Sequence, residues 1–285
     1  MLACPGCQAQ DRLGRRRFLR LLATGAALAL ASCSPGPRRP AARRPSSPAS
    51  SGQVLTEQPP PSTLPLGQIP PPRPGLPQVV SAGPPGTRQI ALTVDDGYCG
   101  PCIAGYVEFA QSSGIQLTFN PNGVYHELWT PTLVEAVRQM VAAGQVQIGN
   151  HTWDHANLLR LPTHRVVYEI SRNEAWIEET FGVTARPWFR PPFGFYDRRV
   201  LEVAADLGYT RVLMWNGTLG DATPESPEQL LALAERWLKP GTIVLGHMNH
   251  PTVLSLFTQL EAIIVQRNLE PVTLDEMFGT SRLTG

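Results

Sequence analysis

Short apolar segments alternate with longer amphipathic segments from about residue 87 to the C-terminus. Continuous apolar runs rich in β-branched residues are typical of buried strands, whereas apolar positions that recur every three or four residues are typical of helices. Strands are predicted at 89–94, 115–119, 146–149, 187–190, 210–214 and 242–246, and helices at 101–113, 130–143, 163–181, 197–207, 226–238 and 252–267. Alternating strands and helices imply a parallel sheet covered by helices. About seven such units in some 200 residues favour a closed or nearly closed (β/α) barrel, in one α/β domain at 87–285.

The first 33 residues have the pattern of an export signal. Residues 14–20 (GRRRFLR) resemble the twin-arginine signal, and the apolar run at 21–31 is shorter than the roughly 20 residues that span a membrane. The run ends in Leu-Ala-Ser-Cys, which resembles a bacterial lipobox in which Cys33 is acylated and becomes the first mature residue. We therefore predict a lipoprotein signal peptide at 1–33. A plain signal peptide with an incidental cysteine is the alternative.

The next segment, 34–86, differs sharply in composition, with 16 prolines in 53 residues. Proline is excluded from the interior of helices and sheets, and so polar a segment buries too little apolar surface to offset its ordering entropy. We predict a disordered, partly extended tether, which would let a domain held by a lipid work at some distance from its membrane.

The charge of the chain is distributed unevenly. From residue 45 onward, 15 lysines and arginines stand against 22 acids, a net charge of −7, although the whole chain carries +1. Nucleic-acid binding requires a basic surface, so this class of function is excluded for the folded domain.

Candidate metal ligands lie at the ends of predicted strands. His151 and His155 are four residues apart, a spacing that lets two side chains meet one ion on a helix face or in a tight turn. Asp95 and Asp96 directly follow the strand at 89–94. Two adjacent carboxylates are unfavourable together unless a cation or an arginine accepts them.

Each of the predicted strand ends that carries a candidate residue would lie on the same rim of the barrel. Active sites of (β/α) barrels are built at the carboxyl ends of the strands. The candidates that follow strands are Asp95, Asp96, His151, Arg190 and His247.

These residue types suit metal-assisted hydrolysis. Asp96 and the two histidines supply three protein ligands, and three ligands with an open position are the pattern of catalytic zinc. Asp95 is then left as a general base, and Arg190 is able to hold its carboxylate. His247 is placed to act as a general acid for the leaving group.

Four motifs in this order resemble the polysaccharide deacetylase family, carbohydrate esterase family four: TVDDG at 93–97, HTWDH at 151–155, RPPFG at 190–194 and VLGH at 244–247. The resemblance covers about residues 88–280. It implies a distorted (β/α) barrel and a metal-dependent hydrolase that removes N-acetyl or O-acetyl groups from glycans. By motif position it implies Asp95 as base, Asp96, His151 and His155 as ligands, Arg190 as partner of the base, and His247 as acid.

Two regions depart from the family pattern. Phe193 stands where the family often has Tyr, and the resemblance makes the backbone N–H there the oxyanion donor, so Phe193 and Pro192 are predicted substrate contacts. Asp221 is able to orient His247, but Ala222 replaces a Trp that usually walls the groove. We interpret these changes as an altered substrate cleft.

Cys99 and Cys102 form a Cys-Gly-Pro-Cys motif directly after the paired carboxylates. The spacing matches a thioredoxin-like redox motif. Outside the cytoplasm, with Cys33 acylated, these two are the only cysteines left, so we predict a disulfide that braces the loop. Free thiols or a redox role are the alternatives.

The sequence thus predicts a lipid-anchored, extracytoplasmic deacetylase of an N-acetylglucosamine polysaccharide such as peptidoglycan or a chitin-like polymer. Zinc is the expected metal, with cobalt, nickel or manganese as alternatives. We expect a monomer that contacts the membrane through its lipid only. The rival functions are an acetyl ester hydrolase acting on a decorated polysaccharide such as xylan, and a catalytically silent glycan-binding lipoprotein.

Overall fold

The computed structural model describes residues 75–280 of the chain. The predicted signal peptide, the lipidation site Cys33 and the tether up to residue 74 lie outside the described residues and remain predictions. Among the described residues, no helix is both long enough and apolar enough to cross a membrane.

The strands of the domain form two parallel sheets. The larger has the order β4-β3-β2-β8-β7 with β9 paired to β2, and the smaller has the order β1-β6-β5. The strands are β1 (Gln78–Val80), β2 (Gln89–Asp96), β3 (Leu117–Pro121), β4 (Val146–Ile148), β5 (Trp188–Phe189), β6 (Arg211–Leu213), β7 (Gly217–Thr218), β8 (Ile243–His247) and β9 (Glu270–Pro271).

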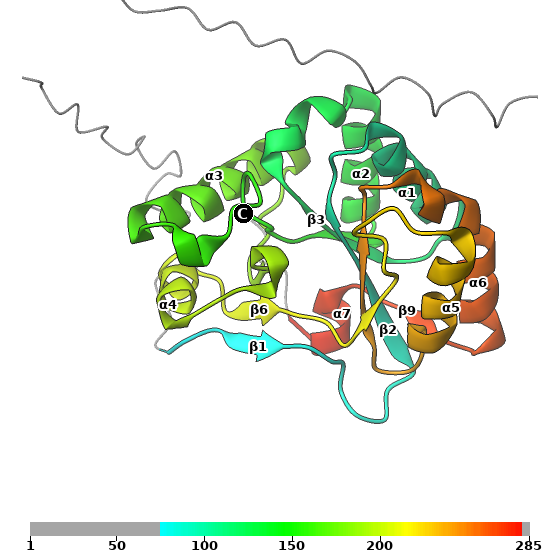
Figure 1. Ribbon diagram of the computed structural model, residues 1–285. Helices are drawn as coiled ribbons and strands as arrows, with labels where there is room; N and C mark the ends of the chain where they lie inside the picture. The colour runs from blue at the N-terminus through cyan, green and yellow to red at the C-terminus, as the bar shows by residue number, and fades with distance from the viewer. Residues whose placement is uncertain (1–74, 281–285) are drawn as a thin grey trace, which may run out of the picture. The chain divides into compact units, whose positions relative to one another are not determined.

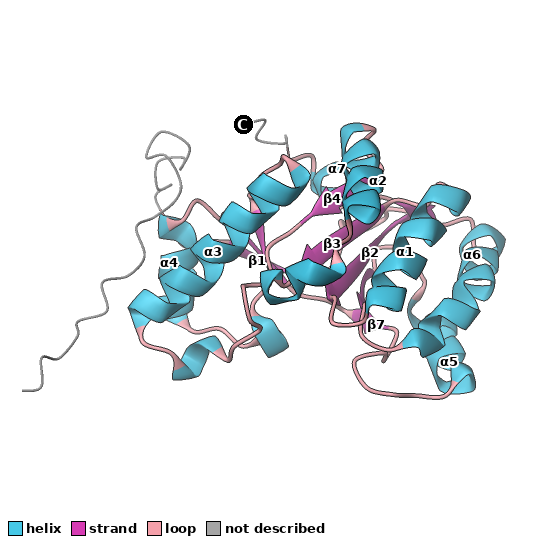
Figure 2. Cartoon of the chain, turned by 90° about the horizontal axis from the view of Figure 1, so that it is seen from above, coloured by secondary structure: helices cyan, strands magenta, loops and turns pink. Residues whose placement is uncertain are grey.

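Helices cover the outside of these strands (Figure 2). The α-helices are α1 (Gly100–Ser113), α2 (Pro131–Ala142), α3 (Thr163–Phe181), α4 (Arg198–Asp206), α5 (Pro227–Trp237), α6 (Phe257–Gln266) and α7 (Leu274–Phe278). Short 3-10 helices are η1 (Gly123–Leu128), η2 (Leu158–Arg160), η3 (Pro192–Gly194) and η4 (Pro251–Leu256). Local sequence explains several starts; α5, for example, opens with Pro227 behind a capping box of Ser226 and Gln229.

The two sheets meet at two isolated bridges, a parallel one between Asn150 and Phe189 and an antiparallel one between Ala82, after β1, and Thr242, before β8. The strands therefore follow one another around the domain from β7 through β2 and β4 to β6 and β1. No ladder joins β1 to β7, the outer strands of this series, within residues 75–280. This is the predicted α/β architecture, a parallel (β/α) barrel that is distorted and incompletely hydrogen-bonded.

All six predicted strands are present, but the N-terminal boundary of the domain is wrong. β1 lies in the predicted tether, where it pairs with β6, and Figure 1 shows these distant segments side by side. Proline-rich sequence around a three-residue strand concealed it. The helix predicted at 252–267 is also corrected, because it begins as η4 and becomes α-helical only in α6.

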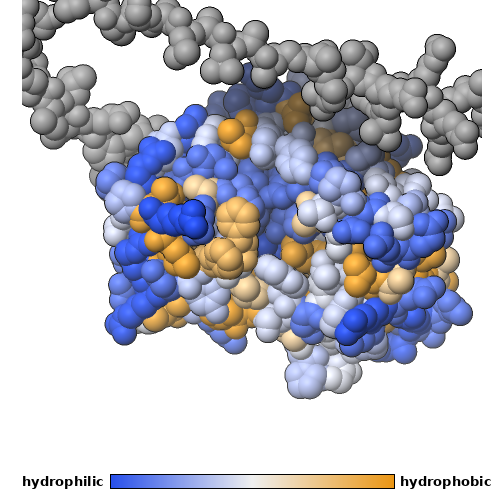
Figure 3. All heavy atoms as spheres, in the orientation of Figure 1, coloured by the Kyte–Doolittle hydropathy of each residue, from blue (hydrophilic) through white to orange (hydrophobic). Residues whose placement is uncertain are grey.

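The central strand β2 is buried on both faces, between β3 and β8. Its continuous apolar run reflects that position, because strands covered on both faces do not alternate with polar residues. By contrast, the surface seen in Figure 3 is mostly hydrophilic, with hydrophobic residues in separate patches. Asp95 and Asp96 at the end of β2 are therefore carried into the interior by a strand that is buried along nearly its whole length.

Candidate active site

Asp95 is in register with a polar residue on each neighbouring strand, Asn120 of β3 and His247 of β8. Its Oδ1 accepts hydrogen bonds from Asn120 Nδ2 at 2.8 Å and from Arg190 Nη1 at 2.6 Å. Arg190 directly follows β5, is fully buried, and also donates from Nη2 to Thr93 Oγ1 at 2.9 Å. Charge-assisted bonds of this length fix the orientation of a carboxylate strongly.

Asp96, His151 and His155 form a compact cluster beside it. Asp96 Oδ1 lies 3.4 Å from His151 Nε2 and 3.5 Å from His155 Nε2, and one ligand atom from each residue falls within 4.8 Å of the others. His151 Nδ1 lies 2.8 Å from the carbonyl oxygen of Arg190. A carbonyl oxygen only accepts, so Nδ1 carries a proton, and in the neutral imidazole Nε2 is the nitrogen that keeps a lone pair for a metal.

The cluster fits a divalent metal for a reason independent of spacing. Asp96 Oδ1 is buried and has no hydrogen-bond partner, although an unpaired buried carboxylate oxygen is strongly unfavourable. The other oxygen, Oδ2, accepts a hydrogen bond from Asn249 Nδ2 at 2.6 Å. The orphaned oxygen thus faces the two imidazoles while its twin is held from behind, and one oxygen with two nitrogens suits zinc and related first-row ions.

The electrostatics of the cluster favour one positive charge. Burial alone would raise the pKa of Asp96, but the close approach and charge of His151, and then the charges of His155 and His247, lower that pKa strongly. Burial lowers the pKa of His151, yet the neighbouring Asp95 and Asp96 carboxylates outweigh it and raise that pKa. Burial and then the charge of His151 lower the pKa of His155 to about 4, so His155 is neutral near pH 7 and able to coordinate a metal.

The backbone around the site adopts conformations that side chains rarely tolerate. Left-handed φ angles occur at Asp96 (69°), Thr152 (70°), His155 (58°) and Phe193 (59°). Such angles outside glycine cost about 1–3 kcal/mol each and concentrate at functional sites. Asn122 Nδ2 holds the histidine loop by donating to the carbonyl oxygens of His151 at 2.6 Å and Thr152 at 3.0 Å.

His247 is in contact with Asp221, the residue that the sequence analysis names as able to orient it. His247 Nδ1 lies 2.9 Å from Asp221 Oδ1, and the His247 backbone N–H donates to Oδ2 at 3.0 Å. Tyr106 adds a bond from its hydroxyl to Oδ2 at 3.5 Å. Burial opposes the imidazolium form of His247, but the bond to Asp221 outweighs it and raises the pKa of His247.

These groups open into one cleft of about 530 Å³. Pro192 is buried and does not line the cleft, whereas its neighbour Pro191 does, and the substrate contact at Pro192 stays a prediction. Phe193 is 54% exposed on the rim. The cleft is lined by Asp95, Asp96, Tyr98, Tyr125, His151, His155, Pro191, Phe193, Gly194, Trp215, Thr218, Ala222, Leu245, His247 and Asn249.

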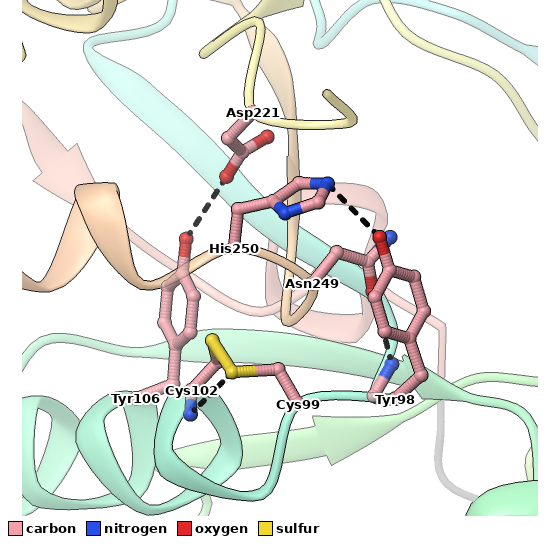
Figure 4. Close-up of a disulfide and its surroundings, with 8 residues drawn as sticks. Tyr98, Cys99, Cys102, Tyr106, Asp221, Asn249 and His250 are labelled. Carbon is pink, nitrogen blue, oxygen red and sulfur yellow. Dashed lines mark hydrogen bonds between the residues drawn. A yellow bond between two sulfur atoms is a disulfide. The ribbon is translucent and has the colours of Figure 1, made fainter. Parts of the chain in front are cut away.

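Cys99 and Cys102 form a disulfide in the turn that leads from β2 into α1 (Figure 4). The Cys99 backbone N–H donates to the carbonyl oxygen of Met248 at 3.2 Å, which ties the turn to the loop after β8. The structure therefore contains the predicted disulfide, which begins three residues after Asp96.

The sequence analysis missed three asparagines that hold the site together: Asn120, Asn122 and Asn249. Asn120 and Asn249 orient the two aspartates, and Asn122 holds the histidine loop. All three lie at or just beyond strand ends, so the rule that located the acids and histidines would also have found them. Asparagine was not considered because it neither titrates nor is a common metal ligand.

The fold and this cluster define a class of parallel α/β barrel with an Asp-His-His centre on its carboxyl rim. Residues 82–212 match the family model described as polysaccharide deacetylase, a span that includes the aspartates, the metal-site histidines and Arg190 but not His247. The domain that contains residues 82–212 belongs to the polysaccharide deacetylase family.

Individual relatives are distant. The chain is 26% identical over 192 residues to the peptidoglycan-N-acetylglucosamine deacetylase PgdA of Listeria monocytogenes, covering 67% of this chain and 39% of that protein. The structure resembles that of the Bc1960 peptidoglycan N-acetylglucosamine deacetylase, with 24% identity, a TM-score of 0.62, and coverage of 72% and 94%. It also resembles BA3943 of Bacillus anthracis, a CE4 family pseudoenzyme, with 22% identity, a TM-score of 0.60, and coverage of 70% and 69%.

The chain spans only part of the length of the curated relatives that it matches. The chain spans 62%, 44% and 48% of the lengths of the first three curated relatives that it matches. The two structural similarities, both under 25% identity, establish the fold alone.

Proposed function

We propose that the protein is a metal-dependent hydrolase that removes acetyl groups from an N-acetylglucosamine polysaccharide. The observation that carries the proposal is the convergence of three units on one cleft: the Asp95–Arg190 pair, the Asp96–His151–His155 cluster and the His247–Asp221 pair. Together they provide a base, a metal site and an acid, which is what hydrolysis of an unactivated amide requires.

A divalent metal would be held by Asp96, His151 and His155, with zinc the first choice and cobalt, nickel or manganese as alternatives. When bound, such an ion supplies Lewis acidity, which acidifies water and polarises a carbonyl group. The low pKa of Asp96 and the neutral His155 keep two of the ligands deprotonated near pH 7.

Asp95 acts as the general base. Arg190 and Asn120 both bind its Oδ1, so Oδ2 is left beside the metal cluster, 3.6 Å from His151 Nε2. Oδ2 takes a proton from the attacking water as the water oxygen bonds to the acetyl carbonyl carbon. Arg190 and Asn120 hold the carboxylate so that this oxygen alone faces the cleft.

His247 acts as the general acid. Its bond to Asp221 fixes the ring and favours the protonated form, so a proton is available for the sugar nitrogen as the carbon–nitrogen bond breaks. Acetate and a free amino sugar are the products, and the proton that Asp95 gained returns His247 to its starting state through water.

Substrate and location are drawn from the relatives and from the N-terminal sequence. Relatives carry the names peptidoglycan-N-acetylglucosamine deacetylase, chitin deacetylase and chitooligosaccharide deacetylase, which supports an N-acetylglucosamine polymer such as peptidoglycan or a chitin-like polysaccharide. Export by residues 1–33, acylation of Cys33 and the proline-rich tether would place the enzyme outside the cytoplasm, on a membrane, within reach of such a polymer.

A silent glycan-binding role is the rival, because a pseudoenzyme occurs among the similar structures. The site of this chain argues for turnover. A binding protein has no use for a buried arginine that orients one aspartate or for a histidine whose protonated form is stabilised, and this chain has both.

The test is acetate release from N-acetylglucosamine oligomers by the full chain, stripped of metal and then reloaded with zinc or cobalt. We expect activity that depends on metal and falls about 10²–10⁴-fold in Asp95→Asn, the usual contribution of a general base. Asp206→Asn makes the same change at an exposed site at the end of α4 and should retain full activity. Acetate release from acetyl esters but not from N-acetylglucosamine oligomers would favour an ester hydrolase. No acetate release from either substrate, despite tight metal binding, would favour the glycan-binding protein.

A further inference from the structure

A fourth asparagine, Asn150, lies directly before the candidate ligand His151 and is fully buried. Its side-chain Oδ1 accepts hydrogen bonds from the Thr152 backbone N–H at 2.9 Å and from Asn173 Nδ2 at 3.0 Å. Its backbone carbonyl oxygen accepts from the Arg190 N–H at 2.9 Å, next to the parallel bridge between the two sheets. Asn150 therefore contacts both the loop of the metal-site histidines and the arginine that binds the candidate base.

Asn150 is the end of a network of buried polar and charged groups. Its Nδ2 donates at 2.6 Å to the hydroxyl of Tyr209, just before β6, and that hydroxyl donates to Glu174 Oε2. Glu174 lies on α3, and its Oε1 accepts from Arg186 Nη1 at 2.8 Å. Tyr209 and Glu174 are fully buried, and Arg186 is 4% exposed. None of these residues lines the cleft, so the network lies outside it, and Asn150 connects the network to His151.

The network is a poor source of stability by itself. Moving two charges out of water opposes folding by about as much as their attraction favours it, and apolar residues often replace a buried ion pair without loss of stability. The Glu174–Arg186 pair has further bonds, since Glu174 accepts from the Ala185 backbone N–H at 3.1 Å and Arg186 Nε donates to the Leu207 carbonyl oxygen at 2.8 Å. A buried network bonded on several sides imposes a definite orientation on each of its members.

The direction of each hydrogen bond fixes which end of the Asn150 amide faces the histidine loop. Burial and the charge of Glu174 raise the pKa of Tyr209 well above its ordinary value, so the hydroxyl keeps its proton and donates it to the carboxylate. Only the NH2 end of the amide is then able to bond the hydroxyl oxygen, and it also donates to the Ile170 carbonyl oxygen at 3.0 Å. Oδ1 is therefore left to accept from Thr152.

The bond from Thr152 holds the turn that carries His151. An asparagine that accepts from the backbone N–H two residues later closes a turn, and here Thr152 has a left-handed φ of 70°, which is unfavourable outside glycine. Asn150 and His151 also hold Arg190 from both sides: the first accepts from its backbone N–H, and Nδ1 of the second lies 2.8 Å from its carbonyl oxygen. A rotated Asn150 amide would thus disturb a candidate metal ligand and the partner of the base together.

We propose that Tyr209 and the buried ion pair behind it are positioning residues for the catalytic centre. They set the orientation of the Asn150 amide, and Asn150 holds His151 and Arg190 in one arrangement. This inference rests on the proposed function, which makes His151 a metal ligand and Arg190 the partner of the base. The network touches neither substrate nor metal, so its loss should weaken metal binding and lower kcat while the substrate contacts, and hence KM, stay in place.

The test is Tyr209→Phe in the full chain, which removes one hydroxyl from the network and keeps the ring. We expect the zinc Kd of the stripped protein to rise about 2–10-fold, the usual contribution of one hydrogen bond. At saturating zinc, kcat should fall by a similar factor, with KM within about two-fold. Tyr168→Phe is the matched control, because its hydroxyl bonds Arg172 on the outer surface of α3 and no member of the network. Thr273→Ala removes the N-cap of α7 and should lower Tm without changing the zinc Kd.

A double variant tests whether Tyr209 acts through Asn150. If it does, adding Tyr209→Phe to Asn150→Ala should change the zinc Kd by less than about two-fold, whereas independent effects would add. Additive losses would overturn the inference, because Tyr209 would then act by another route. If Asn150→Ala does not fold, the single variant Tyr209→Phe decides the question.

Zinc binding needs no substrate, so its measurement separates this inference from the proposed function. A raised zinc Kd in Tyr209→Phe, with Tyr168→Phe unchanged, supports the positioning network even if the wild-type chain releases no acetate. A folded Tyr209→Phe protein with a zinc Kd within about two-fold of wild type, whatever its Tm, would show that the network serves stability alone and would overturn the inference while leaving the proposed enzyme intact.

Discussion

Removal of the Asn249 side chain tests how the metal site is organised. Asn249 Nδ2 donates at 2.6 Å to Asp96 Oδ2, and Asp96 is only 7% exposed. A hydrogen bond to a buried charged group contributes about 1.5–3 kcal/mol. In Asn249→Ala the Oδ2 atom loses its donor, so the metal-free carboxylate is free to turn Oδ1 away from the histidines. Metal binding must then restore that orientation.

We therefore expect Asn249→Ala to weaken zinc binding about 10–100-fold, the usual effect of losing a bond to a metal ligand, which corresponds to about 1.4–2.8 kcal/mol. The measurement is the zinc Kd of stripped full-length protein in competition with a chromophoric chelator. Asn157→Ala is the matched control: Asn157 Oδ1 accepts from the Leu159 backbone N–H at 3.1 Å and touches no ligand of the cluster. A folded Asn249→Ala protein with a zinc Kd within two-fold of wild type would refute the reasoning.

Two further expectations follow from neighbouring groups. The ordinary pKa of a histidine side chain is near 6.5, and the raised pKa of His247 keeps this side chain protonated at higher pH. Activity should therefore be lost only as pH rises through the raised pKa. Asp221→Asn lowers the pKa of His247 and should move the alkaline limb of the kcat profile to lower pH. An unmoved limb would exclude His247 as the acid. In Gly149→Ala the new Cβ would lie 2.1 Å from Asn120 Oδ1, displacing a donor to Asp95. We expect about 1–3 kcal/mol less unfolding free energy in denaturant titrations, with lower kcat, and native values for both would contradict the packing.

The sequence predicted those parts of the fold that depend on local pattern. The continuous apolar run of β2 and the polar residues after it placed Asp95 and Asp96 on the rim, because burial on both faces and strand direction are visible along the chain. β1, β7 and β9 were missed because they leave no apolar run in the sequence: β1 lies among prolines, β7 is Gly217–Thr218 and β9 is Glu270–Pro271. Pairing with the distant strands β6, β8 and β2 specifies them.

The candidate site followed a similar division. The charged and titratable residues of the site were predicted one by one. A buried charge needs an opposite charge or a metal beside it, and the residue types in the sequence already indicate which partner that is. Asn122 and Asn249 were not predicted, because asparagine is also common in exposed loops. Only the folded structure shows which carbonyl or carboxylate oxygen each amide binds. The left-handed φ of Thr152 is likewise imposed by tertiary contacts and leaves no trace in the residue type.

The separation along the chain of the residues that meet at the end of β2 also bears on the order of folding. Arg190 joins Asp95 across 95 residues, and Asn249 joins Asp96 across 153. Contacts so distant in sequence form late, after the entropy of closing large loops has been overcome. An intermediate that lacks β8 beside β2 would hold the cluster without its supporting bond from Asn249. The recovery of high-affinity metal binding during refolding therefore reports when β8 pairs with β2, and it can be measured without any substrate.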